Sequence, residues 1–161
     1  MITEVSHEQI ASYRKNGFLI FEEFYSPGEI EVLRDTVEDA IRKREGAALP
    51  GDPPDPKGDT NPAIFQRINL CVDNPEVREI LHDARLGKLI ADLEGIEGVR
   101  VFVDRAIYKV PWANPTAWHQ DGRKWPFDAT HAVNVWIALE DVGTHNGCLF
   151  YLPGSHSREL E

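Results

Sequence analysis

The amino-acid sequence predicts an α+β protein in which helices come first and a β-sheet is completed late in the chain. Residues 1–95 contain helix-start signals followed by apolar residues at helical spacing, whereas residues 96–161 contain short segments rich in valine, isoleucine and aromatic residues. Helices followed by a run of strands are typical of the α+β class. With 161 residues and a hydrophobic fraction of 42%, the chain can bury one core, so we expect a single domain over residues 1–161.

Two capping boxes mark the starts of the first two helices. A serine followed three residues later by glutamine or glutamate, at positions 6–9 and 26–29, is the sequence signal of this motif. We expect a short helix after the first signal, ended by Gly17, and a longer helix after the second, ended by Gly46. Apolar residues at helical spacing in the second helix predict that one of its faces is buried.

The middle of the chain combines a loop with further helix. Residues 49–62 contain five prolines and no apolar period, which predicts a loop that can act as a lid. The sequence at 73–76 then starts a helical region that runs towards Gly95 with a break near Asp83. Apolar and aromatic patterns predict strands in five other segments. These are residues 18–24, 63–70, 99–110, 133–139 and 147–152.

The composition excludes several classes of partner. A formal net charge of −10 argues against nucleic acid, whose phosphates are bound by clustered lysine and arginine. The basic run at 42–44 is expected to compensate a helix C-terminus instead. No apolar run is long enough to span a membrane, and Cys71 and Cys148 are too few for a disulfide framework. We therefore expect a cytoplasmic protein with reduced thiols that binds neither nucleic acid nor membranes.

A candidate metal site lies in the Trp-His-Gln-Asp sequence at 118–121. Residues two apart in a strand point to the same face, so the imidazole of His119 and the carboxylate of Asp121 project side by side. Gln120 points to the other face, which favours a structural role or a role in supporting the metal ligands from behind. Two histidines and one carboxylate on one face of an octahedron leave the opposite face open for a chelating cosubstrate and O2, as in non-haem Fe(II) oxygenases. The alternatives are a hydrogen-bonded histidine at a strand end and an aspartate that shapes the Asp-Gly turn.

The segments around this motif resemble one known family. Besides the His-x-Asp at 119–121, the chain has Tyr-Lys-Val-Pro at 108–111, a strand with Trp136 downstream, and a Pro-Gly-Ser-His turn at 153–156. Together these segments resemble the phytanoyl-CoA dioxygenase family of Fe(II)- and 2-oxoglutarate-dependent oxygenases.

The resemblance implies a fold and a reaction. The fold is a double-stranded β-helix of the jelly-roll, cupin type with N-terminal helices packed on one sheet. Residues 1–95 would form the mainly helical part, and residues 96–161 the first part of the β-helix. In the implied reaction, Fe(II) and O2 hydroxylate a small organic substrate while the cosubstrate 2-oxoglutarate is decarboxylated to succinate.

The resemblance also implies roles for single residues. His119 and Asp121 would bind iron, and Trp136 would line the 2-oxoglutarate pocket, although the core is the commoner place for a tryptophan. Arg67 matches a position at which relatives have a basic side chain near the cosubstrate, and a solvated arginine at a strand edge is its alternative. Lys109 is the second basic candidate, and an exposed lysine is its alternative.

Aromatic residues surround the ligand segment in the sequence. Trp112, Trp118 and Trp125 are expected to cluster around it, and the Trp-Pro-Phe sequence at 125–127 suits an apolar wall that faces a small organic substrate. The alternative is ordinary packing of a loop against the mouth of the barrel.

The third metal ligand is not evident from the sequence. His131, His145 and His156 are candidates, but the resemblance implies a histidine on a later strand, followed by a group that binds the far carboxylate of 2-oxoglutarate. It makes His156 a structural turn residue. We therefore expect the chain to be a fragment of a longer oxygenase, with a second copy that completes the sheet and a truncated relative as alternatives. Half a jelly roll has unpaired strand edges, which predicts self-association.

Two other functions remain open. A catalytically inactive, truncated jelly-roll module would keep a binding or interaction role and bind metal weakly. A cupin-like metal enzyme that does not use 2-oxoglutarate would recruit His131 or His145 as the third ligand.

Overall fold

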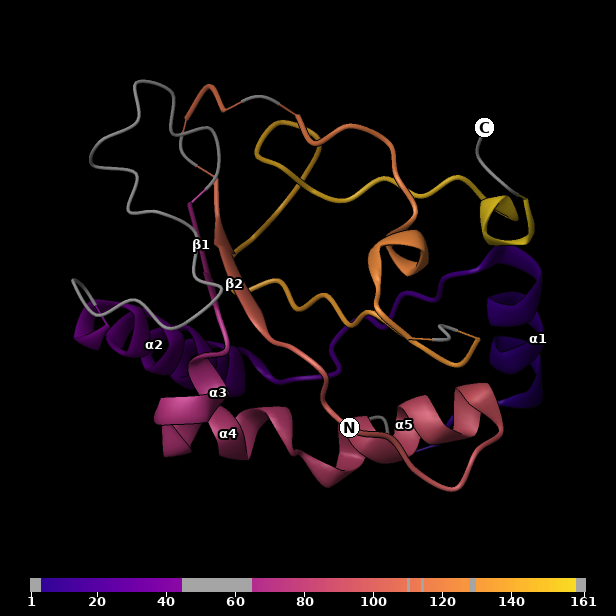
Figure 1. Cartoon of the computed structure of the whole chain (residues 1–161), viewed down its shortest axis with the longest axis horizontal. Coiled ribbons are helices and arrows are strands. Elements are labelled where there is room, and N and C mark those ends of the chain that lie inside the picture. Colours follow the sequence, from indigo (N-terminus) through magenta and orange to yellow (C-terminus); the bar gives the residue numbers. More distant parts are fainter. Residues whose placement is uncertain (1–3, 45–64, 110, 114, 128–129, 159–161) are drawn as a thin grey trace.

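The computed structural model describes residues 4–44, 65–109, 111–113, 115–127 and 130–158. Their helices are α1 (His7–Asn16), α2 (Pro27–Lys43), α3 (Leu70–Asp73), α4 (Pro75–Leu81) and α5 (Ala84–Glu94). Their strands are β1 (Phe65–Ile68) and β2 (Arg105–Tyr108). Helices α1 and α2 lie at opposite ends of the molecule, and most of the chain after β2 runs between them without regular structure (Figure 1).

Both predicted capping boxes are formed. The Ser6 hydroxyl accepts from the Gln9 backbone N–H at 3.2 Å, while the Gln9 side chain accepts from the Ser6 N–H at 2.9 Å. Ser26 and Glu29 make the same pair of contacts at the start of α2. These bonds satisfy backbone donors that a helix start leaves without partners. The first helix ends at Gly17 as predicted, with a left-handed φ of 83°.

The break predicted near Asp83 is also present. Asn74 caps α4 by accepting from the Val77 N–H at 3.0 Å, and Asp83 caps α5 by accepting from the Arg85 N–H at 2.8 Å. Helix α5 ends at the left-handed Gly95, where the helical region was expected to end. Helix α2 ends at Lys43, with Arg44 as its C-cap, whereas the predicted end at Gly46 and the loop at 49–62 lie outside the described residues.

Strands β1 and β2 form an antiparallel pair, in which Phe65 lies opposite Tyr108 and Ile68 opposite Arg105. Both strands fall within predicted segments. The predicted strands at 18–24, 133–139 and 147–152 are wrong, because the backbone there is irregular.

A strand exists only with a hydrogen-bonded neighbour, and apolar patterns do not supply one. The first segment is also turned by Glu23, whose φ is 58°. The prediction of an α+β protein is therefore confirmed as a mixture of helices and one small sheet. Within the described residues this sheet has two strands, so the structure does not display a double-stranded β-helix.

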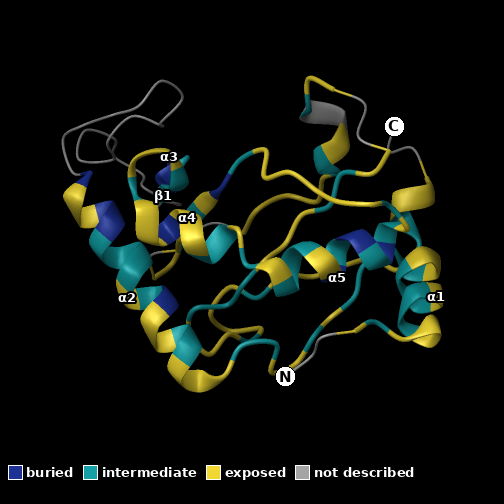
Figure 2. Ribbon diagram, turned by 90° about the horizontal axis from the view of Figure 1, so that it is seen from below, coloured by how far each residue is buried: buried dark blue, intermediate teal, exposed yellow. Residues whose placement is uncertain are grey.

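The core lies between α2, α3 and α4. Ala40 and Ile41 of α2 pack with Leu70 of α3 and Val77 of α4, and Leu70 is only 1% exposed. Figure 2 shows buried residues on the inner side of α2 and along part of α5, whereas most of the remaining backbone is intermediate or exposed. The buried face of α2 confirms the prediction made from its apolar spacing.

A buried carboxylate joins the end of the sheet to this core. Asp104, one residue before β2, accepts from the backbone N–H groups of Leu70 at 2.8 Å and of Cys71 at 3.2 Å. Its carbonyl accepts from Asn69, which has a left-handed φ of 55°. These bonds satisfy donors at the first turn of α3, so Asp104 orients α3 against the strand pair.

The same carboxylate affects a thiol. Burial, together with a hydrogen bond to Asp104, raises the pKa of Cys71 to about 11 from an ordinary value of 9.0. Because the thiolate is the reactive form, Cys71 is expected to be alkylated by iodoacetamide about a hundredfold more slowly in the native protein than in urea at pH 8. A Cys148→Ser protein isolates the Cys71 signal for mass spectrometry. Equal rates in the native and unfolded states would contradict this assignment.

Large apolar side chains remain exposed along β2 and the chain after it. Those with at least half of their surface exposed are Phe102, shortly before β2, and Ile107, Trp112, Trp118, Phe150 and Leu152. Contiguous exposed apolar surface favours association, so self-association stays a prediction. Among the described residues, no helix combines the length and the apolar character needed to cross a membrane.

Candidate metal centre

His119 and Asp121 lie next to each other at the start of a 3-10 turn over Asp121–Lys124. His119 Nε2 is 3.2 Å from Asp121 Oδ1, and both side chains are 41% exposed. The extended backbone of Gln120, with φ −120° and ψ 123°, places both side chains on one face, as the strand spacing predicts. The aspartate itself begins a turn, which is the turn-forming role considered for it.

The hydrogen bonds around His119 decide which ring nitrogen is available. Nδ1 lies 2.8 Å from the carbonyl oxygen of Ala117. A carbonyl only accepts, so Nδ1 carries the proton and Nε2 of the neutral ring presents its lone pair to the Asp121 carboxylate. Two acceptors facing each other repel unless a positive charge lies between them. A proton on Nε2 or a metal ion would supply that charge.

The spacing of the pair fits a shared metal ion. Nitrogen and oxygen ligands about 2.1 Å from an ion and about 90° apart are separated by about 3.0 Å. The observed 3.2 Å between His119 Nε2 and Asp121 Oδ1 is close to this value. In metal-binding histidines, the ring nitrogen that does not bind the metal typically donates its N–H to a carbonyl or carboxylate, which orients the ring. The Nδ1–H of His119 donates to a carbonyl in the same way.

Two further residues approach Asp121. The side-chain amide of Asn134 donates to Asp121 Oδ2. The pKa of Tyr151 is raised, first by burial and then by the Asp121 charge, and its ring stacks on Phe18 at 4.9 Å between centroids. Neither contact was expected from the sequence. Asn134 could have been noticed in the sequence because it is a polar residue in the otherwise apolar segment at 133–139, two positions before Trp136.

Gln120 links the segment at 118–121 to the Pro-Gly-Ser-His turn. Its side-chain amide donates to the carbonyl oxygens of Ser155 and Arg158, both at 2.8 Å. This agrees with the structural role expected for Gln120.

Hydrogen bonds to α1 hold the Pro-Gly-Ser-His turn in place. The Gly154 N–H donates to the Asn16 carbonyl at 2.8 Å, and His156 Nε2 lies 3.1 Å from the Arg14 carbonyl. A Cβ on Gly17 would lie 2.2 Å from His156 Nδ1, so only glycine fits beneath this ring. His156 is thus a structural turn residue here.

The other candidate third ligands lie elsewhere. His131 Nδ1 is 3.1 Å from Glu94 Oε2, and Glu94 Oε1 accepts from the Tyr13 hydroxyl at 2.5 Å. Burial and this carboxylate raise the pKa of Tyr13. The ring of His145 lies against Gly143 in its own turn. Within the described ranges, no group of three or more histidine, cysteine, aspartate or glutamate residues could hold a metal ion.

The predicted cosubstrate residues occupy different environments. Arg67 lies on β1 opposite Ala106 and is 6% exposed, so the alternative of a solvated arginine at a strand edge is wrong. Lys109 is exposed, and its stem lies close to Gly147. Trp136 is 44% exposed, which excludes a fully buried core position. His119 hydrogen-bonds the Ala117 carbonyl, and Asp121 accepts from the Asn134 side chain.

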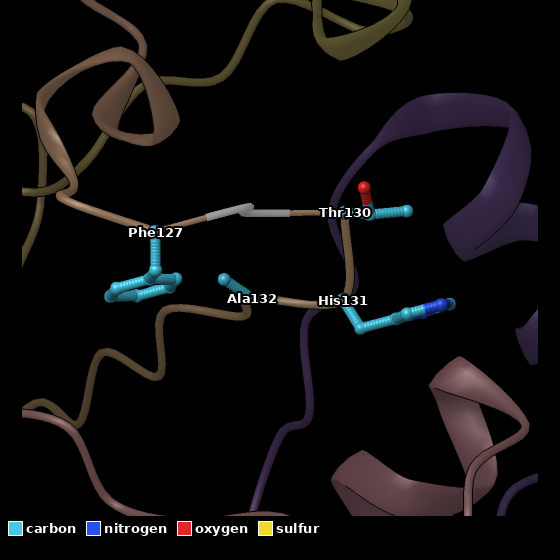
Figure 3. Close-up of a pocket in the computed structure, with 4 residues that line it drawn as sticks. All are labelled: Phe127, Thr130, His131 and Ala132. Carbon is cyan, nitrogen blue, oxygen red and sulfur yellow. The ribbon is translucent and has the colours of Figure 1, made fainter.

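The expected aromatic cluster forms only in part. Trp125 stacks on Phe127 at 5.6 Å, and Phe127 meets Phe102 edge-on at 4.7 Å. Trp112 is fully exposed, with a left-handed φ of 68°, so its predicted place in the cluster is wrong. Phe127 also borders an open hollow with a cavity volume of about 270 Å³ (Figure 3). Its other lining residues are Thr130, His131 and Ala132.

Comparison with known proteins identifies the family. The family model described as phytanoyl-CoA dioxygenase matches residues 13–161. The chain belongs to the phytanoyl-CoA dioxygenase family. The match covers the paired His119 and Asp121 and every other residue considered for the site, so these residues belong to the family domain.

Several curated proteins are similar to the chain. Ectoine dioxygenase of Bordetella parapertussis is 30% identical over 94% of this chain and 50% of its own length. The peroxisomal phytanoyl-CoA dioxygenase of Bos taurus is 27% identical over 98% and 49%. Methylphosphonate hydroxylase of Gimesia maris is 27% identical over 99% and 60%. The chain thus spans about half to three fifths of the length of these relatives. No solved structure shows significant similarity to it.

Proposed function

We propose that this chain carries iron-binding residues of a 2-oxoglutarate-dependent dioxygenase that hydroxylates a small organic substrate. The observation that carries the proposal is the pairing of His119 Nε2 with Asp121 Oδ1 at 3.2 Å. One neutral imidazole and one carboxylate at this separation suit two neighbouring positions on an octahedral ion. Membership of a family with dioxygenase relatives supports the same chemistry.

Each protein group has a defined task in this proposal. His119 and Asp121 hold the ion, and the Ala117 carbonyl fixes the imidazole tautomer by accepting from Nδ1. When bound, Fe(II) with 2-oxoglutarate and O2 supplies substrate hydroxylation coupled to decarboxylation to succinate. We assign Trp136 to the wall of the cosubstrate pocket.

The two basic residues are assigned to the cosubstrate. Arg67 and Lys109 carry positive charge suited to its carboxylates. Arg67 is the stronger candidate because it is buried and a guanidinium binds carboxylates in a fixed planar geometry.

The proposal includes a fold and a domain arrangement. Residues 1–161 would form a single domain, with residues 96–161 contributing the first part of a double-stranded β-helix. The exposed apolar side chains on β2 and beyond support this arrangement, since a completed β-helix would cover such a face. The names of the relatives differ in their substrates, so the proposal stops at a small organic molecule.

Stepwise anaerobic titration tests this proposal. Fe(II) is added to the full 161-residue chain, followed by 2-oxoglutarate, and the visible absorption is recorded. We expect a charge-transfer band on the second addition, because 2-oxoglutarate chelates iron through its keto and carboxylate oxygens. Succinate, which lacks the keto group, is the matched control and should produce no band.

The two ways of failing are distinct. Iron binding without a 2-oxoglutarate band would point to a metal enzyme that does not use this cosubstrate. No iron binding at all would overturn the assignment of His119 and Asp121 in this chain.

A further inference from the structure

The Asp121 carboxylate is engaged at both of its oxygens by different partners. Oδ1 faces His119 Nε2 at 3.2 Å, and Oδ2 accepts the side-chain amide of Asn134. We propose that Asn134 is a positioning residue of the metal site, whose amide holds Oδ2 so that Asp121 presents only Oδ1 to the ion. This inference rests on the proposed function, because it concerns the metal-binding role of Asp121.

The exposure of Asp121 explains why such a partner matters. A carboxylate that is 41% exposed rotates about its last torsion, which is broad for aspartate. Binding a metal ion would then restrict this rotation at a cost in entropy. A hydrogen bond from Asn134 to Oδ2 selects one orientation before the ion arrives. Outer partners of this kind typically change metal affinity by about 10- to 100-fold.

A carboxylate bound through one oxygen also preserves room on the ion. An octahedral ion has six positions, of which three protein ligands take half and leave the other half open. A chelating cosubstrate and O2 together need all three open positions. A carboxylate bound through both oxygens would occupy one of them. By engaging Oδ2, Asn134 keeps Asp121 in the one-oxygen mode that the proposed reaction requires.

The place of Asn134 in the chain makes the contact informative. It lies 13 residues after Asp121, in the irregular segment at 133–139 that also carries Trp136. No backbone ladder in the described part of the chain joins this segment to the metal-binding segment. The amide contact therefore connects the metal ligand with the segment assigned to the cosubstrate pocket. A merely structural bond between two loops is the competing explanation.

Cobalt affinity of four proteins distinguishes the two explanations. Co(II) is titrated into the full chain, Asn134→Ala, Asp121→Ala and the double variant, and its visible absorption gives each Kd. We expect Asn134→Ala to weaken Co(II) binding about tenfold or more in the unaltered background. In the Asp121→Ala background the same change should have less than a twofold effect, because its target oxygen is absent.

A matched asparagine supplies the control. Asn146 also uses its side chain to join loop backbone, accepting from the Gly143 N–H at 2.6 Å and donating to the Asp141 carbonyl at 2.7 Å. Asn146→Ala should leave the Co(II) affinity unchanged. Circular dichroism shows whether each variant is folded, and Asn134 is exposed, so alanine there should leave the fold intact.

The outcomes separate this inference from the proposed function. If Asp121→Ala weakens Co(II) binding but Asn134→Ala does not, Asn134 has no positioning role and the metal site stands. Equal losses from Asn134→Ala in both backgrounds would also overturn the inference, because the effect would not act through Asp121. If the unaltered chain binds no Co(II), the proposed function fails and this inference fails with it.

Discussion

Replacing either His119 or Asp121 by alanine is expected to weaken Fe(II) binding by more than a hundredfold. Each variant removes one of the two proposed ligand atoms, which face each other at 3.2 Å, and no third candidate ligand stands beside them among the described residues. Losing a direct ligand should exceed the tenfold to hundredfold effect typical of an outer partner. Asp121→Ala also removes the negative charge that attracts the ion. Anaerobic equilibrium dialysis of Fe(II) measures both effects.

Two other histidines provide the comparison that decides between rival enzymes. His131 contacts Glu94, and His145 lies within its own turn, so alanine at either position should leave the Fe(II) affinity unchanged. A loss at His131 or His145 comparable with that at His119 would favour a cupin-like enzyme that recruits one of them as third ligand. Full retention of iron by both His119→Ala and Asp121→Ala would contradict the metal site.

The largest expected effect on stability is that of Arg44→Met. The Arg44 side chain is 3% exposed, makes two bonds to the Asp73 carboxylate and donates to the carbonyl oxygens of Ile68 and Asn69. Methionine roughly preserves the volume but removes the guanidinium donors from these acceptors, of which the Asn69 carbonyl still accepts from the Val72 N–H. Removing one partner of a buried ion pair costs about 3–5 kcal/mol. Because Asp73 is 46% exposed and its charge is partly solvated, we expect the lower end, about 3 kcal/mol.

A neighbouring arginine is the control for this substitution. Arg42 pairs with Asp39 at 3.3 Å, but its side chain is 67% exposed. An exposed ion pair contributes little to the free energy of unfolding, so Arg42→Met should leave the urea midpoint nearly unchanged. Urea unfolding followed by circular dichroism compares the three proteins. Similar losses in Arg42→Met and Arg44→Met would show that charge at the end of α2, rather than buried bonding, is responsible.

Helix starts and the break between α4 and α5 were predictable because their causes are local. Ser6 with Gln9, and Asp83 with the Arg85 N–H, meet across two or three residues, so the sequence alone contains both partners. The end of α1 at Gly17 follows from the left-handed conformation that glycine adopts without strain. The side-by-side arrangement of His119 and Asp121 has the same local origin, since it needs only one extended residue between them.

Strands were predicted less well than helices, because a strand forms only beside a hydrogen-bonded neighbouring strand. Apolar alternation in the sequence does not indicate which segment that neighbour is. The segments at 63–70 and 99–110 contain two strands that pair with each other over four residues each. The segments at 133–139 and 147–152 form no strand in the structure. Alternation of apolar residues states which face would be buried, but hydrogen bonds to a neighbour decide whether a strand forms.

The sequence by itself therefore determined α1, α2, the α4–α5 region, the family and the side-by-side placement of His119 and Asp121. Only the tertiary structure decided which arginine of the 42–44 run is buried and which asparagine meets Asp121. Arg44 and Arg42 cannot be distinguished by their place in the basic run. In the structure Arg44 is buried against Asp73 of α3, whereas Arg42 faces solvent. Asn134 reaches Asp121 from 13 residues away. Both results depend on contacts between segments, and such contacts follow from how the chain packs rather than from local propensity.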